Sequence, residues 1–412
     1  MNRRAFLRCA GAGALAFSGL SGLTRDAKAA TSNKVLVAVF MRGGWDGLNI
    51  CVPHGDDNYY SLRPSLAIRP PSSGNAQSAL NLDGFFGFHP AMTSLYDLYQ
   101  QGMVAVLPAV HYSGSSRSHF SGQDMIESAG APALTSGWLA RYLQQASSAP
   151  SAKAFSLSDQ IPYSLLGLST PITSFPDLSN LQIAATPVDR PLFADVIANS
   201  YREAPNPANP LAGALHGVGR TLLDELSALQ AVGQMPADSS AVYPNVNFGR
   251  QLRQAAALIK ANTGHEIITL NFGGWDTHSN QGAGDSAAPM SRLLTDFSDC
   301  INAFFADLGN SASRVLLMTS TEFGRTAAQN GSLGTDHGNA STWFLIGPNV
   351  RGGIHTGTGW PGLAKSQLVE ERALAHSIDY RNIYAEVLEK HLGATNMAGV
   401  LPGFTSRPVG IL

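Results

Sequence analysis

The stretch "KVLVAVFMRGGWD", Lys34–Asp46, is an apolar run that ends in Gly-Gly-Trp-Asp, and Glu266–Asp276, "EIITLNFGGWD", repeats the arrangement. Apolar runs rich in β-branched residues are typical of strands buried on both faces of a parallel sheet. Each Asp therefore follows the carboxyl end of a predicted strand, where open α/β sheets bind ligands. The paired glycines let the chain turn close to such a ligand. Because the surrounding regions do not otherwise match, we interpret the repeat as a shared local function.

Further apolar runs predict more strands of the same sheet, at Met103–Val110, Arg314–Ser320 and Thr342–Ile346. Segments with helical spacing of apolar residues lie between the predicted strands, at Pro90–Gln101, Phe248–Ala261, Met290–Leu308 and Asp379–Leu392. This alternation predicts an α/β fold with a parallel, doubly wound sheet. The Ser- and Pro-rich stretch around 149–211 predicts an insertion or a cap over that sheet.

The first 29 residues have the layout of a cleaved export signal, with a basic start, an apolar middle and the small-residue end Ala27-Lys28-Ala29. The pair Arg3-Arg4 resembles a twin-arginine signal, and an ordinary Sec signal is the alternative. The apolar part is too short and Gly-rich for a spanning helix. We expect a mature protein that starts near Ala30, is periplasmic or secreted, and has no stable membrane span.

The composition bounds the remaining possibilities. The chain has 412 residues, of which 44% are hydrophobic and 14% charged, and this permits one large domain or two ordinary ones. A net charge of −2 provides no basic field for nucleic acid or anionic lipid. Cys51 and Cys300 remain after export, and they either pair in an oxidising compartment or form two separate buried thiols.

Polar residues of a metal-binding type follow several predicted strands. His278 lies two residues after Asp276, Glu322 follows the strand that ends at Ser320, and Asp336-His337 precede the strand at Thr342. The segment "HYSGSSRSHFSGQDMIE" places Ser115, Ser116, Ser118 and His119 near the start of a predicted helix, where an anion is favoured. Carboxylates with imidazoles form a ligand set for a divalent metal, and a metal beside a Ser hydroxyl suits phosphoryl or sulfuryl transfer. Turn formation, capping and simple ion pairs are the alternative roles for these residues.

Several motifs occur in a fixed order along the chain: "RGGWDGLN", "RSHF", "SGWLARYL", "FGGWDTHSN", "TEFGRT", "GTDHGNA" and "DYRNIYAEVLEKHLG". Together they resemble the bacterial domain-of-unknown-function family 1501 (DUF1501) over essentially the whole mature chain, 30–412. That family is grouped with the alkaline phosphatase–sulfatase superfamily. The resemblance implies an alkaline phosphatase-like three-layer α/β/α sandwich with a mostly parallel central sheet and metal at the strand ends.

The resemblance also implies roles for individual residues. It makes Ser118 the favoured nucleophile, with Ser115 and Ser116 as alternatives, beside His119 and with Arg325 steadying the anion. The implied metal ligands are Asp46, Asp276, His278, Glu322, Asp336 and His337. Phe323 stands where the superfamily usually has a histidine, and the sulfatase motif Cys-x-Pro-Ser-Arg is absent, so formylglycine chemistry is not expected.

The sequence thus favours an exported metal-dependent hydrolase of phosphate or sulfate esters, whose substrate is a small molecule or a polysaccharide. The metal is Zn, Mg, Mn or Ca, and the sequence leaves its identity and number, and the oligomeric state, open. The alternative is a non-catalytic exported protein that keeps the fold and binds an envelope partner or polysaccharide. If Asp46 and Asp276 share one ion, their carboxyl carbons should lie within roughly 8 Å of each other.

Overall fold

The computed structural model describes residues 34–72, 74–130, 133–146, 154–168, 172–178, 185–186, 188–202, 226 and 228–412. The export signal expected at 1–29 lies outside these ranges. So does much of the insertion expected at 149–211.

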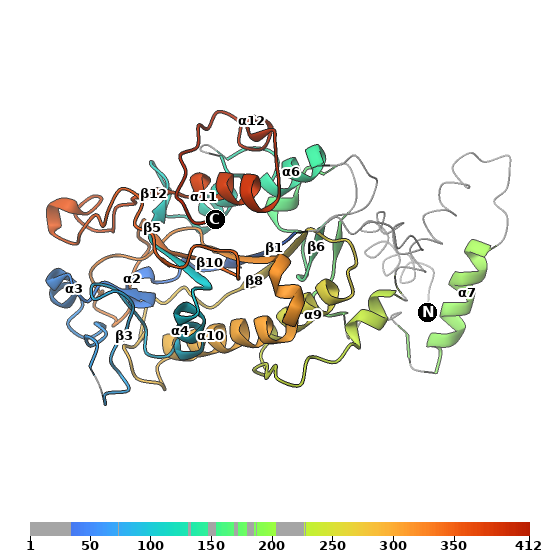
Figure 1. The fold of residues 1–412 in the computed structure, drawn as a ribbon, viewed down its shortest axis with the longest axis horizontal. Coiled ribbons are helices and arrows are strands. Elements are labelled where there is room, and N and C mark those ends of the chain that lie inside the picture. Colours follow the sequence, from blue (N-terminus) through green and yellow to red (C-terminus); the bar gives the residue numbers. More distant parts are fainter. Residues whose placement is uncertain are drawn as a thin grey trace.

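One large sheet organises the described part of the chain (Figure 1). Its strands follow the order β11-β5-β10-β9-β1-β8-β6-β7, and β12 pairs with β5 beyond this path. Their bounds are β1 Val35–Met41, β5 Val104–His111, β6 Ala154–Ser156, β7 Thr173–Ser174, β8 Ile267–Phe272, β9 Val315–Ser320, β10 Ser341–Ile346, β11 Gly353–Ile354 and β12 Ile378–Asp379. The five strands predicted from apolar runs are all present, within about a residue at each end, because such runs are stable only where both faces are covered.

The sheet is mostly parallel, with β10 as the exception. This strand is antiparallel to both β5 and β9. The expected mostly parallel sheet is confirmed, and the strand predicted at Thr342–Ile346 is the one that runs antiparallel to its neighbours. Because β10 runs in the opposite direction, the residues that precede it lie at the edge where the parallel strands end.

Helices cover both faces of the sheet and form the outer layers of a three-layer α/β/α sandwich (Figure 1). One core holds Val35, Val37 and Val39 of β1 with α4 (Thr93–Gln100), α9 (Asn247–Lys260) and α10 (Pro289–Leu308). The other core holds Leu36 and Phe40 of β1 with α5 (His119–Ser128), α6 (Trp138–Ala146), α11 (Tyr380–Glu386) and α12 (Met397–Val400). Alternate residues of one strand enter opposite cores because successive side chains point to opposite faces.

Short elements complete the described fold. A second sheet of order β2-β4-β3 packs beside α2 and α3. The helix α7 lies between β7 and α9 in the chain. Their bounds are α2 Gly47–Ile50, β2 Cys51–Val52, α3 Asp57–Leu62, β3 Leu80–Asn81, β4 Gly87–Phe88 and α7 Arg190–Arg202. The helix predicted at Asp379–Leu392 is α-helical to Glu386 and continues as a π-helical turn. Cys51 and Cys300 are both free and buried. None of the helices in the described ranges is long and apolar enough to cross a membrane.

Candidate metal centre

The two Gly-Gly-Trp-Asp copies lie side by side at the carboxyl edge of the sheet. They follow β1 and β8, which are parallel neighbours in register from Leu36 opposite Ile267 to Met41 opposite Phe272. The buried rings of Trp45 and Trp275 meet edge to face with centroids 5.5 Å apart. Gly43 has φ 119°, and a Cβ there would lie 2.7 Å from the backbone nitrogen of Asp276. The close contact between the copies therefore requires glycine at this position.

Arg325 clamps the two copies together. Its guanidinium donates to the carbonyls of Gly43 and Gly44 at 2.6 Å, to that of Trp275 at 2.9 Å, and to Asp276 Oδ1 at 2.6 Å. Arg325 is 1% exposed. All of these acceptors belong to the protein, so the contacts do not support the expected role of Arg325 in steadying a substrate anion.

Asp46, from the first copy, is committed to a different partner. Arg63 donates to its Oδ2 at 2.5 Å and to its Oδ1 at 2.9 Å, and Gln281 Nε2 donates to Oδ2 at 2.6 Å. Asp46 and Arg63 are both buried. A carboxylate that already accepts three hydrogen bonds from buried donors is poorly placed to bind an ion. We therefore leave Asp46 out of the metal set, and the geometry does not support one ion shared by Asp46 and Asp276.

Asp276, from the second copy, is surrounded by three imidazoles. Its Oδ1 lies 3.1 Å from Nε2 of His278 and 3.1 Å from Nε2 of His337. Its Oδ2 lies 3.5 Å from Nε2 of His119. The donor atoms of His119, Asp276 and His337 all fall within 4.8 Å of one another. Three chain segments, at His119, at 276–278 and at His337, thus bring four ligand-type side chains close together.

The second nitrogen of each imidazole faces an oxygen acceptor. Nδ1 of His119 lies 2.8 Å from Glu322 Oε1, that of His278 lies 3.0 Å from Asp336 Oδ1, and that of His337 lies 2.8 Å from the carbonyl of Arg117. The hydrogen bond at each Nδ1 fixes the orientation of the ring and directs Nε2 toward the cluster. This pattern is the usual outer support of metal-binding histidines.

The ligand-type atoms of this arrangement are closely spaced. Nε2 of His278 and Nε2 of His337 lie 3.0 Å apart. An ion with tetrahedral Zn–N bonds near 2.0–2.1 Å would space its ligand atoms by roughly 3.3 Å. The donor atoms present therefore fit a metal ion. Imidazole nitrogens with one carboxylate favour Zn or a related transition metal over Mg or Ca.

Glu322 and Phe323 lie behind the cluster. Glu322 is fully buried and accepts from the backbone nitrogen of Gly43 at 2.9 Å and from Gln123 at 3.1 Å, in addition to its contact with His119. Its contacts make it a support for His119. Phe323 takes the place of the expected histidine, and its ring lies 5.0 Å from that of His119 and 4.6 Å from that of His337. It therefore forms an apolar floor that fixes both imidazoles.

The candidate serines have different degrees of freedom. Ser115 Oγ donates to Asn339 Oδ1 at 3.1 Å, and Ser116 Oγ accepts from the backbone nitrogen of Ser118 at 3.1 Å. Ser118 is the N-cap of α5, yet its hydroxyl makes no capping hydrogen bond. It is exposed and directly precedes His119. Of the three, Ser118 has the hydroxyl least committed to the fold.

The two partly exposed carboxylates of the site are stabilised as anions. Desolvation acts to raise the pKa of Asp276, but the hydrogen bond and charge of Arg325, with His337 and His278, bring it below its ordinary value. The pKa of Asp336 is lowered by hydrogen bonds from Asn330 and His278. Both groups are therefore charged at neutral pH, as a cation site requires.

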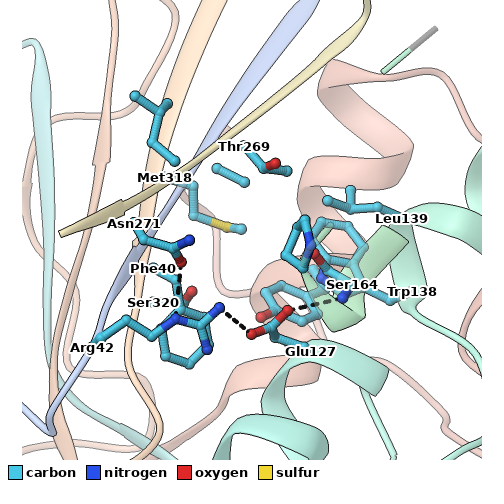
Figure 2. A pocket seen from close by; sticks show the side chains of 14 residues that line it. Phe40, Arg42, Glu127, Trp138, Leu139, Ser164, Thr269, Asn271, Met318 and Ser320 are labelled. Atoms are coloured by element: carbon cyan, nitrogen blue, oxygen red, sulfur yellow. Dashed lines mark hydrogen bonds and ion pairs between the residues drawn. The ribbon is translucent and has the colours of Figure 1, made fainter. Parts of the chain in front are cut away.

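Arg42, at the start of the first copy, points to the other face of the sheet. Figure 2 shows its guanidinium between Asn271, which accepts from Nε at 2.9 Å, and Glu127, at 2.5 Å. Glu127 in turn accepts from the backbone nitrogen of Ser164 at 2.9 Å. The cavity beside them measures about 20 Å³, enough for a single water molecule. No substrate fits there, so this face has a structural role.

Sequence reasoning assigned several partners differently or missed them. His119 was expected as a catalytic residue, but the structure brings its Nε2 to the metal-type cluster. Arg63 and Gln281 carried no local signal, because their link to Asp46 depends on contacts between distant segments. The support from the Arg117 carbonyl is a backbone contact, which no residue pattern reveals.

The family model described as "Protein of unknown function (DUF1501)" matches residues 33–403. No curated protein matches the sequence.

Similar solved structures all have low identity. Ps i-CgsB in complex with k-i-k-neocarrahexaose is 10% identical with a TM-score of 0.38, covering 90% of this chain and 74% of that one. The C-terminal periplasmic domain of EcEptC from Escherichia coli, in complex with Zn, is 10% identical with a TM-score of 0.34, covering 76% and 72%. A protein in the alkaline phosphatase superfamily from Vibrio parahaemolyticus is 10% identical with a TM-score of 0.32, covering 86% and 71%.

Proposed function

The chain belongs to the DUF1501 family of proteins of unknown function, and from that premise we propose that it is a metal-dependent hydrolase of phosphate or sulfate esters. Membership of the alkaline phosphatase–sulfatase superfamily is part of the same proposal, and the motif resemblance supports it. The metal ligands are Asp276, His119, His278 and His337.

One observation carries the proposal. Nε2 of His278 and Nε2 of His337 lie 3.0 Å apart and each lies 3.1 Å from the same oxygen of Asp276. Their Nδ1 atoms are held by Asp336 and the Arg117 carbonyl, so both Nε2 atoms face inward. Two imidazole nitrogens and a carboxylate oxygen at this spacing form a ligand set for a transition-metal ion.

The chain supplies the remaining groups for ester cleavage. Ser118 is the nucleophile. It is the N-cap residue of α5, its exposed hydroxyl makes no capping hydrogen bond, and it directly precedes His119 of the cluster in sequence. The free N–H groups at the start of α5 favour an anionic group in front of that hydroxyl. A metal ion bound at the cluster would lower the pKa of a nearby hydroxyl and offset charge that develops on the ester oxygens. Glu322 and Phe323 keep His119 in place.

The test combines metal analysis with turnover. We expect purified protein to carry stoichiometric transition metal and to hydrolyse 4-nitrophenyl phosphate or 4-nitrophenyl sulfate. Ser118→Ala should keep the metal and lose turnover, whereas Asp276→Ala should lose both. The matched controls Ser113→Ala and Asp159→Ala change exposed residues and should behave as wild type. Metal-free wild type after growth with added Zn, or equal turnover by wild type and Asp276→Ala, would refute the proposal.

Phe323 gives a second candidate function some support. A phenyl ring occupies the space of a usual ligand and packs on both His119 and His337. A site with fewer ligands suits a protein that keeps the fold and binds an envelope partner or polysaccharide without catalysis. Metal-loaded protein that binds vanadate but turns over neither ester favours this second function.

Export forms a further part of the proposal. The twin-arginine pair Arg3-Arg4 and the small-residue end at Ala29 support transport to the periplasm or medium, with a mature start near Ala30. Mass spectrometry of the exported protein checks this, since an intact Met1 end contradicts it.

A further inference from the structure

We propose that the cavity on the far side of Asp336 from the metal cluster binds a neutral, polyhydroxylated group of the substrate, such as one sugar ring. This names the organic part of the ester and rests on the proposed function for its link to catalysis. The cavity measures about 370 Å³ and is lined by three chain segments, around Leu62, at 326–336 and at 368–372. That volume lies in the range of small-ligand sites.

The cavity walls are tied together by hydrogen bonds. Arg63 donates to the carbonyls of Thr326 and Ala327, each at 2.9 Å. Gln329 Oε1 accepts from the backbone nitrogens of Ser65 and Leu66, and the nitrogen of Ala327 donates to the carbonyl of Arg372. The segments therefore hold their positions without a ligand. A pre-formed site loses little ordering entropy when a ligand binds.

Side chains that retain free hydrogen-bonding capacity face this cavity. Among the described residues the guanidinium of Arg372 has one partner, Asp336 Oδ2, at the long distance of 3.7 Å. Gln329 uses only its oxygen in the contacts above, so its amide N–H groups remain. Glu371 adds acceptor oxygens, while Lys365 at 2.8 Å balances its charge.

The mixture of hydrogen-bond donors and acceptors on the cavity wall indicates the chemical class of the ligand. Arg372 and Gln329 donate, whereas Glu371 and Asp336 accept, so the wall offers both roles without a net positive field. A hydroxyl group donates and accepts, and a ring of hydroxyls can satisfy such a wall where a carboxylate would meet Glu371 and Asp336. Leu62, Ala328 and Leu368 supply the apolar surface that matches the C–H face of a sugar ring.

Asp336 connects this cavity to the reaction centre. Its Oδ1 holds His278 at 3.0 Å, and its Oδ2 faces Arg372. A sugar ring in the cavity therefore lies one side chain away from the cluster.

Binding of free sugars tests the inference without any catalysis. The probes are D-galactose and D-glucose, with succinate as the carboxylate comparison. Saturation-transfer NMR measures their binding to the complete mature protein, with and without EDTA. We expect both sugars to bind in either state. Arg372→Gln should weaken sugar binding about tenfold through loss of a charged donor, and Ala328→Trp should abolish it by filling the cavity. Ala328 is exposed, so the larger side chain does not enter the core.

Arg407→Gln is the matched control, because Arg407 is an exposed arginine outside the cavity lining, and it should bind as wild type. Sugar binding unchanged by Arg372→Gln and Ala328→Trp overturns the inference, as does binding of succinate alone. These outcomes are separate from failure of the proposed function. A metal-free protein whose sugar binding still depends on Arg372 keeps the cavity assignment and removes only the catalytic link.

Discussion

The two Gly-Gly-Trp-Asp copies share a sequence, a preceding strand and a position at the sheet edge, yet their aspartates do different things. Asp46 is buried and paired with Arg63, whereas Asp276 is 46% exposed on its side chain and faces three imidazoles. Their tryptophans pack on each other at 5.5 Å. The comparison shows that a local motif fixes a backbone turn, while the neighbours that the fold supplies decide what its carboxylate does.

The largest expected difference concerns stability. Asp46→Ala leaves the buried Arg63 guanidinium without its carboxylate, and breaking such a pair costs about 3–5 kcal/mol. Asp276→Ala removes a half-exposed carboxylate from the buried Arg325, which keeps its backbone acceptors, so the loss should be smaller, about 1.5–3 kcal/mol. Urea unfolding of both metal-free variants measures the two values.

The double variant Asp46→Ala with Arg63→Met controls for the cause. Removing both charges should recover part of the loss, because no unpaired ion remains buried. Equal destabilisation by Asp46→Ala and Asp276→Ala would remove the distinction between the copies.

A smaller effect should come from the support behind the cluster. Glu322→Gln keeps the side-chain shape but gives His119 a weaker acceptor at Nδ1, so metal affinity should fall about 10–100-fold. Competition with a fluorescent chelator measures the affinity. Glu389→Gln, at an exposed position outside the cluster, is the control and should leave affinity unchanged. An unchanged affinity in Glu322→Gln would mean that His119 does not bind the metal.

The last expected effect is common to both copies. Trp45 Nε1 donates to the Thr342 carbonyl at 2.8 Å, and Trp275 Nε1 donates to the Phe272 carbonyl at 3.0 Å. Trp45→Phe and Trp275→Phe each remove one hydrogen bond and part of a buried ring, and should each cost about 1–3 kcal/mol without changing metal content. Thermal unfolding with metal analysis checks this. A loss of metal in one variant alone would show that the tryptophans also differ in role.

The sequence by itself determined the strands and the approximate helix bounds. Short apolar runs rich in β-branched residues, such as Lys34–Met41, favour a buried strand, and the Gly-Gly pairs after β1 and β8 permit a sharp change of direction at the strand end. It also pointed to Asp276, His278 and His337 as polar residues at one edge of the sheet. These inferences succeeded because they depend on local periodicity and on the common edge where parallel strands end.

Only the tertiary structure decided which of these residues meet. His337 precedes its strand, and it reaches the site because β10 runs antiparallel, a choice made by pairing with β5 and β9. The pairing of Asp46 with Arg63 and of His119 with Glu322 joins segments that have no local relation in sequence. A side chain's partner is set by packing across the whole chain, because burial makes an unpaired charge too costly and the nearest available counter-charge satisfies it. The aspartate of the same strand-end motif is therefore a structural ion-pair partner in the first copy, as Asp46, and a candidate metal ligand in the second, as Asp276.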